Sequence, residues 1–152
     1  MRRVSFGSAD CPVARALDVI GDWWSLLIVR DAFDGVRRFG AFQKNLGVAK
    51  GMLATRLQAL VEAGVLELAP ASDGSAYSEY VLTAKGRDLF VVVAALRQWG
   101  EDHLFAAGEP RSALVDARDG APVARLEVRA ADARPLAFDE TRVEKARPAK
   151  GA

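Results

Sequence analysis

The stretch at residues 39–64, FGAFQKNLGVAKGMLATRLQALVEAG, has the pattern of two short amphipathic helices joined by a tight bend. Large apolar residues recur three or four positions apart in each half, which is the period of one helix face. They are Phe39, Phe42 and Leu46 in the first half, and Leu53, Leu57, Leu60 and Val61 in the second. Gly47 stands at the bend and Gly64 at the end, where helices commonly need a residue that tolerates left-handed backbone angles. The stretch therefore predicts a helix–turn–helix in which each helix buries one face.

The second helix of this pair leaves its other face free. Small, polar and basic side chains occupy that face: Lys50, Gly51, Met52, Ala54, Thr55, Gln58 and Ala59, with Arg56 at its border. Such a face is typical either of a solvated helix or of a helix that reads a DNA groove. Local charge favours DNA, because five basic residues and one acid lie between positions 34 and 57, whereas the whole chain has a formal net charge of +1. Phosphate binding requires such a concentration of cations, since each neutralised phosphate releases counterions.

Composition limits the other classes of protein. The 152 residues suffice for one domain with a real core, and 51% hydrophobic with 27% charged residues is ordinary for a soluble globular protein. No apolar run of about 18 residues is present, so we expect no membrane span. The first residues lack the apolar segment of a secretory signal, and one cysteine, Cys11, permits neither an internal disulfide nor a cysteine-rich zinc site. We therefore expect a cytoplasmic protein without a metal or cofactor.

The residues before the helix pair predict a short arm and two further helices. Residues 1–10 are expected to form the arm. Apolar residues at positions 12–20 fit one helix face, and Pro12 at a first-turn position is a start signal. Gly21 is expected to end that helix, and Asp22 to cap the next one.

The helix expected at residues 23–33, WWSLLIVRDAF, is apolar on nearly all sides. This composition is typical of a central, buried helix, so we expect Trp23 and Trp24 to pack in the core. A competing hypothesis places Trp23, Phe33 and Trp99 around a small aromatic or apolar effector at a dimer interface.

A hairpin is expected after the helix pair, with strands at residues 65–70 and 79–83 around a loop rich in turn-forming residues. A hairpin directly after a groove-reading helix is the wing of a winged helix. No Lys or Arg occurs between Leu57 and Ala84, so wing contacts with DNA would need backbone amides or hydroxyls such as those of Ser75 and Tyr77. We expect these contacts to be weak and to depend little on salt.

Thr83 is placed to cap a long final helix with an apolar stripe. The domain is too small to bury this whole stripe against its own core. A partner subunit would cover the rest, which predicts a twofold homodimer. The expected interface residues on this helix are Leu89, Val93, Leu96 and Trp99.

Composition changes after Pro110. Two strand-like runs surround Asp119 and Gly120, a strong turn signal, so residues 109–141 are expected to form a β-hairpin extension. An isolated hairpin is marginally stable, and this one should pack on the body or on a partner chain. Without a cysteine it cannot hold a zinc ion in the usual way. Residues 142–152 are expected to form a flexible basic tail.

Several ordered motifs resemble the HxlR-type regulators, bacterial winged-helix proteins related to the MarR group. The motifs are Cys11-Pro12, IGDWWSLLIVR, RRFGAF, MLATRL and YVLTAKG, and the resemblance covers roughly residues 10–105. It implies an α+β, mainly α fold: a winged helix-turn-helix domain at residues 11–108 with N- and C-terminal dimerisation helices. The N-terminal helix would then join the dimer interface through Val13 and Leu17. The family's members are dimeric transcription factors in which each wing and recognition helix meets one operator half-site.

The recognition helix departs from the family pattern at its start. Where relatives commonly have a serine cap followed by proline, this chain has Ala49 and Lys50. Loss of the cap should cost about 1 kcal/mol of helix stability. Arg56 matches a position at which the family keeps arginine, for which the resemblance implies a DNA contact. The residues expected to contact DNA are Arg37, Arg38, Lys44, Lys50, Gly51, Met52, Thr55, Arg56, Ser75 and Tyr77.

The resemblance also implies a signal for Cys11, because several family members use a cysteine at this place as a redox or electrophile sensor. A helix N-terminus favours the reactive thiolate, although many such cysteines are inert small hydrophobes. The expected function is a dimeric DNA-binding repressor that responds to such a signal or to a small effector. The alternative is a winged-helix module for protein contacts without specific DNA binding. An enzyme is not expected, since His103 is the single histidine and no second nucleophile or base completes a catalytic group.

Overall fold

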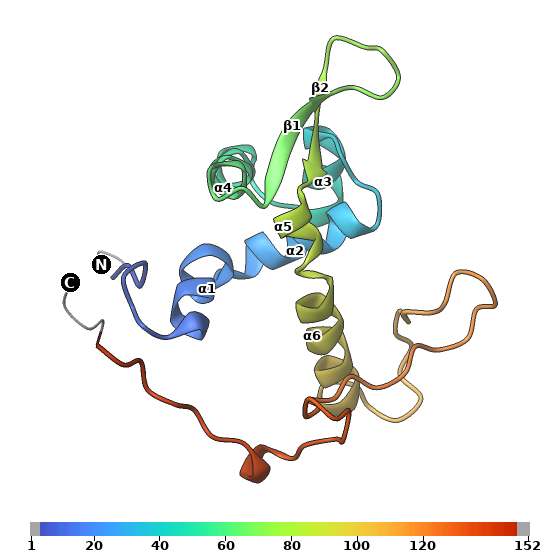
Figure 1. The fold of residues 1–152 in the computed structure, drawn as a ribbon. Helices are drawn as coiled ribbons and strands as arrows, with labels where there is room; N and C mark the ends of the chain where they lie inside the picture. The colour runs from blue at the N-terminus through green and yellow to red at the C-terminus, as the bar shows by residue number, and fades with distance from the viewer. Residues whose placement is uncertain (1–3, 149–152) are drawn as a thin grey trace. The chain divides into compact units, whose positions relative to one another are not determined.

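Residues 4–148 are described by the computed structural model, which is mainly helical with one short antiparallel hairpin (Figure 1). The helices are α1 (Pro12–Ile20), α2 (Trp23–Phe33), α3 (Phe39–Leu46), α4 (Lys50–Glu62), α5 (Ala84–Arg87) and α6 (Phe90–His103), and the strands are β1 (Leu66–Pro70) and β2 (Ser78–Leu82). A 3-10 turn, η1, covers Phe138–Glu140. The chain divides into two compact units, the first ending at Val93 and the second beginning at Ala94. This order confirms the predicted α+β winged helix–turn–helix.

The helix starts follow the sequence signals closely. Pro12 opens α1, and the Asp22 carboxylate caps α2 by accepting the Ser25 backbone N–H at 2.9 Å and the Ser25 hydroxyl at 2.6 Å. Gly21 ends α1 at a position that favours glycine, because a Cβ atom there would lie 2.2 Å from the Leu17 carbonyl oxygen. The predicted arm is tied to α1 through Asp18, whose carboxylate accepts the Ser5 hydroxyl at 3.0 Å. Residues 1–3 of that arm lie outside the described part of the chain.

The helix–turn–helix consists of α3 and α4 with Gly47 between them in the left-handed region, at φ +63°. The α4 helix begins at Lys50 without a side-chain cap, because Ala49 has no hydrogen-bonding group to offer. Gly64, at φ +73°, follows its last turn. The predicted bend, bounds and missing cap of the recognition helix are therefore confirmed.

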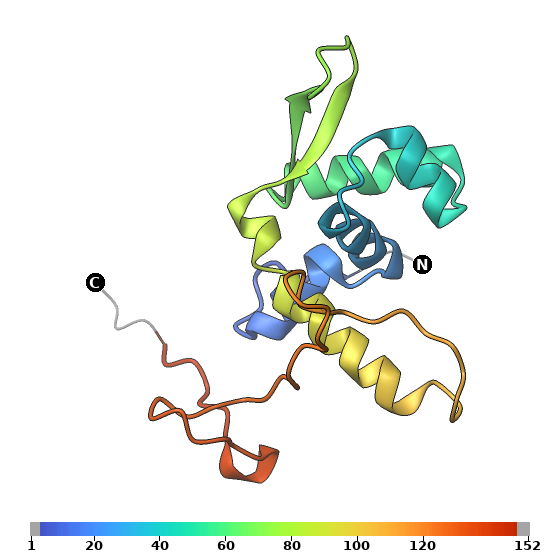
Figure 2. The same cartoon turned by 90° about the vertical axis from the view of Figure 1, so that its right-hand side faces the viewer.

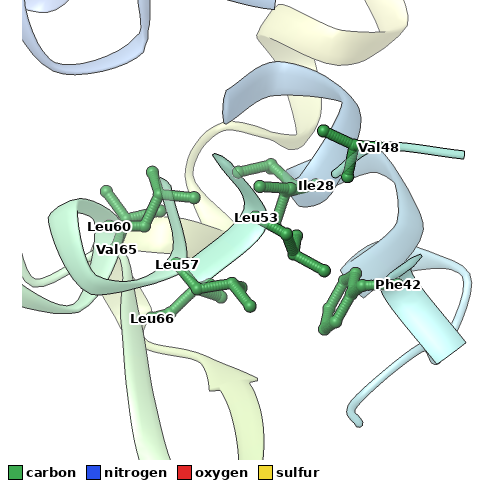
Figure 3. Close-up of a cluster of buried hydrophobic side chains, with 9 residues drawn as sticks. Ile28, Phe42, Val48, Leu53, Leu57, Leu60, Val65 and Leu66 are labelled. Carbon is green, nitrogen blue, oxygen red and sulfur yellow. The ribbon is translucent and has the colours of Figure 1, made fainter. Parts of the chain in front are cut away.

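The core lies where α2, α3 and α4 meet the start of β1. Its fully buried side chains converge from these elements (Figure 3), and they are Ile28, Val29, Phe42, Leu53, Leu57, Leu60 and Leu66. Burying a side chain of this size stabilises the fold by about 1.5–3 kcal/mol relative to exposing it. The core therefore fixes one face of α4 and leaves the opposite face to solvent.

One core prediction is wrong. Trp23 is 81% exposed, whereas Trp24 is half-buried against the core cluster. The buried face of α2 contains Ser25, Ile28 and Val29, and Trp23 lies on a different side of the helix from them. Near-uniform hydropathy around α2 hid this difference between its faces.

The wing pairs β1 with β2 from Leu66 opposite Leu82 to Pro70 opposite Ser78, as the sequence predicted within one or two residues. The single long helix predicted after Thr83 is instead broken. Thr83 caps only α5, by accepting the Gly86 N–H at 3.0 Å, and the Leu89 N–H then bonds three residues back, to the Gly86 carbonyl. Glycine and aspartate, at positions 86 and 88, are weak helix formers, which favours the interruption.

The second unit contains α6 from Ala94 onward and the extension. The turn at Asp119 and Gly120 is present, with Gly120 at φ +73°, but residues 109–141 contain two isolated bridges and the turn η1, and no strand. The predicted β-hairpin is therefore wrong as regular structure. Each bridge contains a proline, Pro122 or Pro135, which lacks the N–H that a strand ladder requires.

The extension packs on α6 of its own chain, one of the two positions predicted for it. The buried Gln98 side chain donates to the Ala124 carbonyl at 3.0 Å and accepts the Leu126 N–H at 2.8 Å. Asp102 pairs with Arg125 further along the helix. The Gln98 amide thus supplies hydrogen bonds to the backbone of the kind that a neighbouring strand would otherwise provide to the extension. Residues 149–152 of the predicted basic tail lie outside the described chain.

The view turned by 90° shows α3, α4 and the hairpin of the first unit from another side (Figure 2). Among residues 4–148, no helix is long and apolar enough to cross a membrane.

Candidate nucleic-acid interface

The outer face of α4 is the first part of the candidate interface. Leu53, Leu57 and Leu60 bury one side of the helix, and the residues predicted for the free face are all exposed. The exposed residues are Lys50, Gly51, Met52, Ala54, Thr55, Gln58 and Ala59. Thr55 donates its hydroxyl to the Gly51 carbonyl at 2.9 Å, so its oxygen remains an acceptor. This face offers mainly small side chains and one apolar side chain, Met52, which allow a close approach to a groove.

Lys50 adds a cation at the N-terminal end of α4. The first turn of this helix contains no acid, and Lys50 and Lys44 have no ion pair among residues 4–148. A cation at this end of a helix is repelled by the helix dipole, and an anion bound there removes the repulsion. Lys50 therefore favours a phosphate at the start of α4.

Arg56 lies at the border of the free face, as the sequence suggested, and it contacts an acid there. Its side chain is 29% exposed, and Nε is 3.5 Å from the Asp22 carboxylate that caps α2. The same Nε atom is buried without a hydrogen bond. Arg56 thus connects α4 to the start of α2, and its contact with an acid reduces the charge available on the free face.

Arg37 and Arg38 also meet acids, which come from the wing. Glu79 of β2 is only 4% exposed, and Arg37 Nη1 and Arg38 Nε lie 3.6 and 3.9 Å from its carboxylate oxygens. Ser72 donates its backbone N–H and its hydroxyl to Glu79 at 3.2 and 3.0 Å. Burial raises the pKa of Glu79, but these hydrogen bonds and the charge of Arg37 outweigh it and lower the pKa overall. An ionised Glu79 therefore holds the start of α3 to the wing.

Arg38 extends from there to the tip of the wing. Its Nη2 donates to Asp73 Oδ2 at 2.6 Å and to the Ser75 hydroxyl at 3.2 Å, and the guanidinium carbon lies 5.7 Å from the centre of the Tyr77 ring. The wing, which has no basic residue of its own, thus receives one from the segment before α3. Neither Asp73 nor Glu79 was predicted as a partner, because each lies at least 35 positions from Arg38 in the sequence.

The proposed sensor and effector residues lie as follows. Cys11 is exposed at the N-cap of α1. Trp23 and Phe33 occupy opposite ends of α2, about 15 Å apart at the rise of an α-helix, so they do not line one small pocket within a chain. Phe33 instead contacts Phe90, with ring centres 5.3 Å apart. Trp99 belongs to the second unit and lies beside His103, with ring centres 5.2 Å apart.

The residues predicted for a dimer interface fall into two groups. Val13, Leu17, Leu96 and Trp99 are exposed in the single chain. Leu89 and Val93 are partly buried and pack against the core cluster of their own unit. Only the first group has apolar surface that a partner could extensively cover.

The two-helix reading unit and the hairpin that follows it define a winged helix–turn–helix protein. The HxlR-like helix-turn-helix family matches residues 19–107, and the chain belongs to that family. An HTH-type transcriptional regulator of Mycobacterium tuberculosis, Rv3095, which is not characterised, is 48% identical over 92 residues. That match covers 60% of this chain and 58% of the relative, so the chain spans less than two thirds of the relative's length.

Two solved structures extend the comparison. A candidate transcription factor, PA1607, has a TM-score of 0.89 at 57% identity, covering 94% of this chain and all of that one. This coverage includes most of the extension. The redox regulator HypR in its oxidised form has a TM-score of 0.57 at 31% identity, covering 63% of this chain and all of that one.

Proposed function

We propose that the protein is a DNA-binding transcriptional regulator in which α4 enters the major groove. The observation that carries this proposal is the exposed outer face of α4 on a helix whose opposite face is fully buried. Lys50 and Lys44 would neutralise phosphates beside that groove. The names of the relatives, HTH-type transcriptional regulators and transcription factors, support the same function.

Replacing Lys50 by glutamine is expected to weaken binding to a duplex taken from upstream of the protein's own gene. One lost phosphate contact lowers the affinity roughly eightfold at 0.1 M salt and reduces the slope of log K against log salt by about 0.9 per subunit. A fluorescence-anisotropy titration over a salt series measures both quantities.

Lys85→Gln is the matched control, because Lys85 bonds the Ala63 carbonyl at the other end of α4. It removes the same charge and should change the affinity little. Equal effects of the two substitutions would contradict a phosphate at Lys50. Absence of binding to every duplex would favour the alternative, a module for protein contacts.

We also propose that the protein works as a homodimer. Leu96 and Trp99 of α6, together with Val13 and Leu17 of α1, are large apolar side chains exposed to solvent in the single chain. A second copy that covers them would bury apolar area and present two recognition helices to two operator half-sites.

Cys11 is the proposed redox sensor of this dimer. It is exposed at the N-cap of α1, two residues before Val13, and the relative HypR is named a redox regulator. Diamide would accept two electrons and two protons from two Cys11 thiols, forming a disulfide between subunits. We expect light scattering to show a dimer before treatment, a non-reducing gel to show a covalent dimer after it, and operator affinity to change.

Cys11→Ser should keep the dimer and lose both effects of diamide. A monomer before treatment would contradict the proposed assembly, and unchanged affinity in the treated wild type would contradict sensing by Cys11. For the other proposed signal, a small effector, the first unit has an open groove in which Phe33, Val36, Tyr80 and Phe90 lie beside the charged residues Arg37, Glu67 and Arg87.

A further inference from the structure

The ion pair between Arg38 and Asp73 joins residues 35 positions apart in the sequence at the tip of the wing. Arg38 Nη2 lies 2.6 Å from Asp73 Oδ2, and the two side chains are 41% and 58% exposed. Asp73 Oδ1 also accepts the Ser75 N–H at 3.0 Å, which shapes the turn of the wing. The hydrogen bonds from the Ser75 backbone and hydroxyl, followed by that from Arg38, lower the pKa of Asp73 to about 2. Asp73 therefore stays ionised at neutral pH.

Arg38 is the cation best placed to serve the wing on DNA. The wing between Leu57 and Ala84 has no Lys or Arg, and the Arg38 guanidinium lies beside Ser75 and over Tyr77. A guanidinium binds a phosphate through the same N–H groups with which it binds a carboxylate. Asp73 and a DNA phosphate would thus compete for Arg38.

A phosphate can reach Arg38 because the Arg38–Asp73 pair lies on the surface. Exposed ion pairs contribute little stability, so Arg38 can exchange Asp73 for a phosphate at a small cost. Glu79, whose carboxylate is 3.9 Å from Arg38 Nε, would hold the arginine near the wing while the tip pair opens.

We propose that Asp73 masks Arg38, so that this arginine contacts a DNA phosphate through the wing only when the Asp73 ion pair opens, and Asp73 thereby limits the affinity for DNA. The inference rests on the proposed function as a DNA-binding protein. Asp73 would then determine how much the wing contributes to the affinity for DNA.

Asp73→Asn tests the masking directly, because asparagine retains an acceptor for the Ser75 N–H and loses the charge. The probe is a mixed-sequence DNA duplex of about three helical turns, which accommodates two half-sites. We expect Asp73→Asn to bind roughly 2- to 5-fold more tightly at 0.1 M salt, with a steeper slope of log K against log salt.

Two variants separate unmasking from a general loss of negative charge. Glu67→Gln removes one acid from the exposed side of β1, where residues 4–148 provide it with no ion pair, and should have a much smaller effect. Arg38→Gln combined with Asp73→Asn should lose the gain in affinity and the steeper slope. Circular dichroism establishes that each variant is folded.

The outcomes divide clearly. A gain in Asp73→Asn that exceeds the gain in Glu67→Gln and disappears in the double variant supports the masking. Equal gains in the two single variants, a gain that survives in the double variant, or no gain at all would overturn it. If the wild type binds the duplex and Lys50→Gln weakens that binding, the proposed function stands even when the masking fails, whereas a wild type that binds no DNA overturns both.

Discussion

Replacing Phe42 by alanine is expected to lower the free energy of unfolding by about 3–5 kcal/mol. Phe42 is fully buried and contributes an aromatic ring to the buried cluster that joins α2, α3, α4 and β1 (Figure 3). Its ring also meets Tyr80 of β2 edge-on, with ring centres 6.4 Å apart. Alanine would leave a cavity between the recognition helix and the wing, which the surrounding helices can only partly fill.

The loss is large compared with the total stability of a typical domain, about 5–15 kcal/mol. Urea denaturation followed by circular dichroism measures the free energy, and a melting curve should show a fall of about 12 °C or more. Phe42→Leu is the control, because it keeps most of the apolar volume and should cost less than about 1.5 kcal/mol. Equal stabilities of the alanine and leucine variants would contradict the central position of this ring.

The helix–turn–helix could be predicted because its determinants are local. The spacing of Phe42, Leu53 and Leu57 defines the buried faces, and the left-handed glycine at Gly47 defines the bend. The cap of α2 at Asp22 is likewise a contact with Ser25, only three residues away. Interactions between residues a few positions apart can be predicted from the sequence pattern alone, and the structure confirms them here.

The faces of α2 and the path after the wing could not be predicted in the same way. Hydropathy is nearly uniform around α2, so only packing distinguishes exposed Trp23 from half-buried Trp24. After the wing, Gly86 of α5 fits closely against the backbone of Val65, a contact across 21 positions that no local pattern indicates. In the extension, Pro122 and Pro135 outweighed the strand-like pattern around the turn.

The positive charge that is free to contact DNA is smaller than the number of basic residues in the sequence indicates. Between positions 34 and 57, five basic residues lie before α4 or within it. The fold brings Glu79 and Asp73 to Arg37 and Arg38, and Asp22 to Arg56. These acids lie outside the sequence window in which the positive charge was counted. Lys44 and Lys50 are the two cations of that window left without an ion pair within residues 4–148. Arg56 already contacts an acid, whereas Lys50 has no ion pair within residues 4–148. Lys50 is therefore a stronger candidate for phosphate binding than Arg56.

Replacing Gly86 by alanine is the second large change, with an expected cost of about 3 kcal/mol or more. A Cβ atom at this position would lie 2.1 Å from the Val65 carbonyl oxygen and 3.0 Å from the Leu82 side chain. The Val65 oxygen cannot easily move aside, because it accepts the Thr83 N–H at 3.1 Å where the wing returns to α5. Relief of the overlap would require α5 to separate from the residues that lead into β1.

Gly40→Ala is the matched control for this substitution. Gly40 lies within α3, where an added Cβ meets no atom within 4 Å, so alanine should stabilise the helix by about 0.5–1 kcal/mol. Chemical denaturation of the two variants should therefore give free-energy changes of opposite sign. A Gly86→Ala variant as stable as the wild type would contradict the close approach of α5 to Val65. Because that approach fixes the base of the wing, the same variant should also weaken DNA binding in its folded fraction, whereas Gly40→Ala should not.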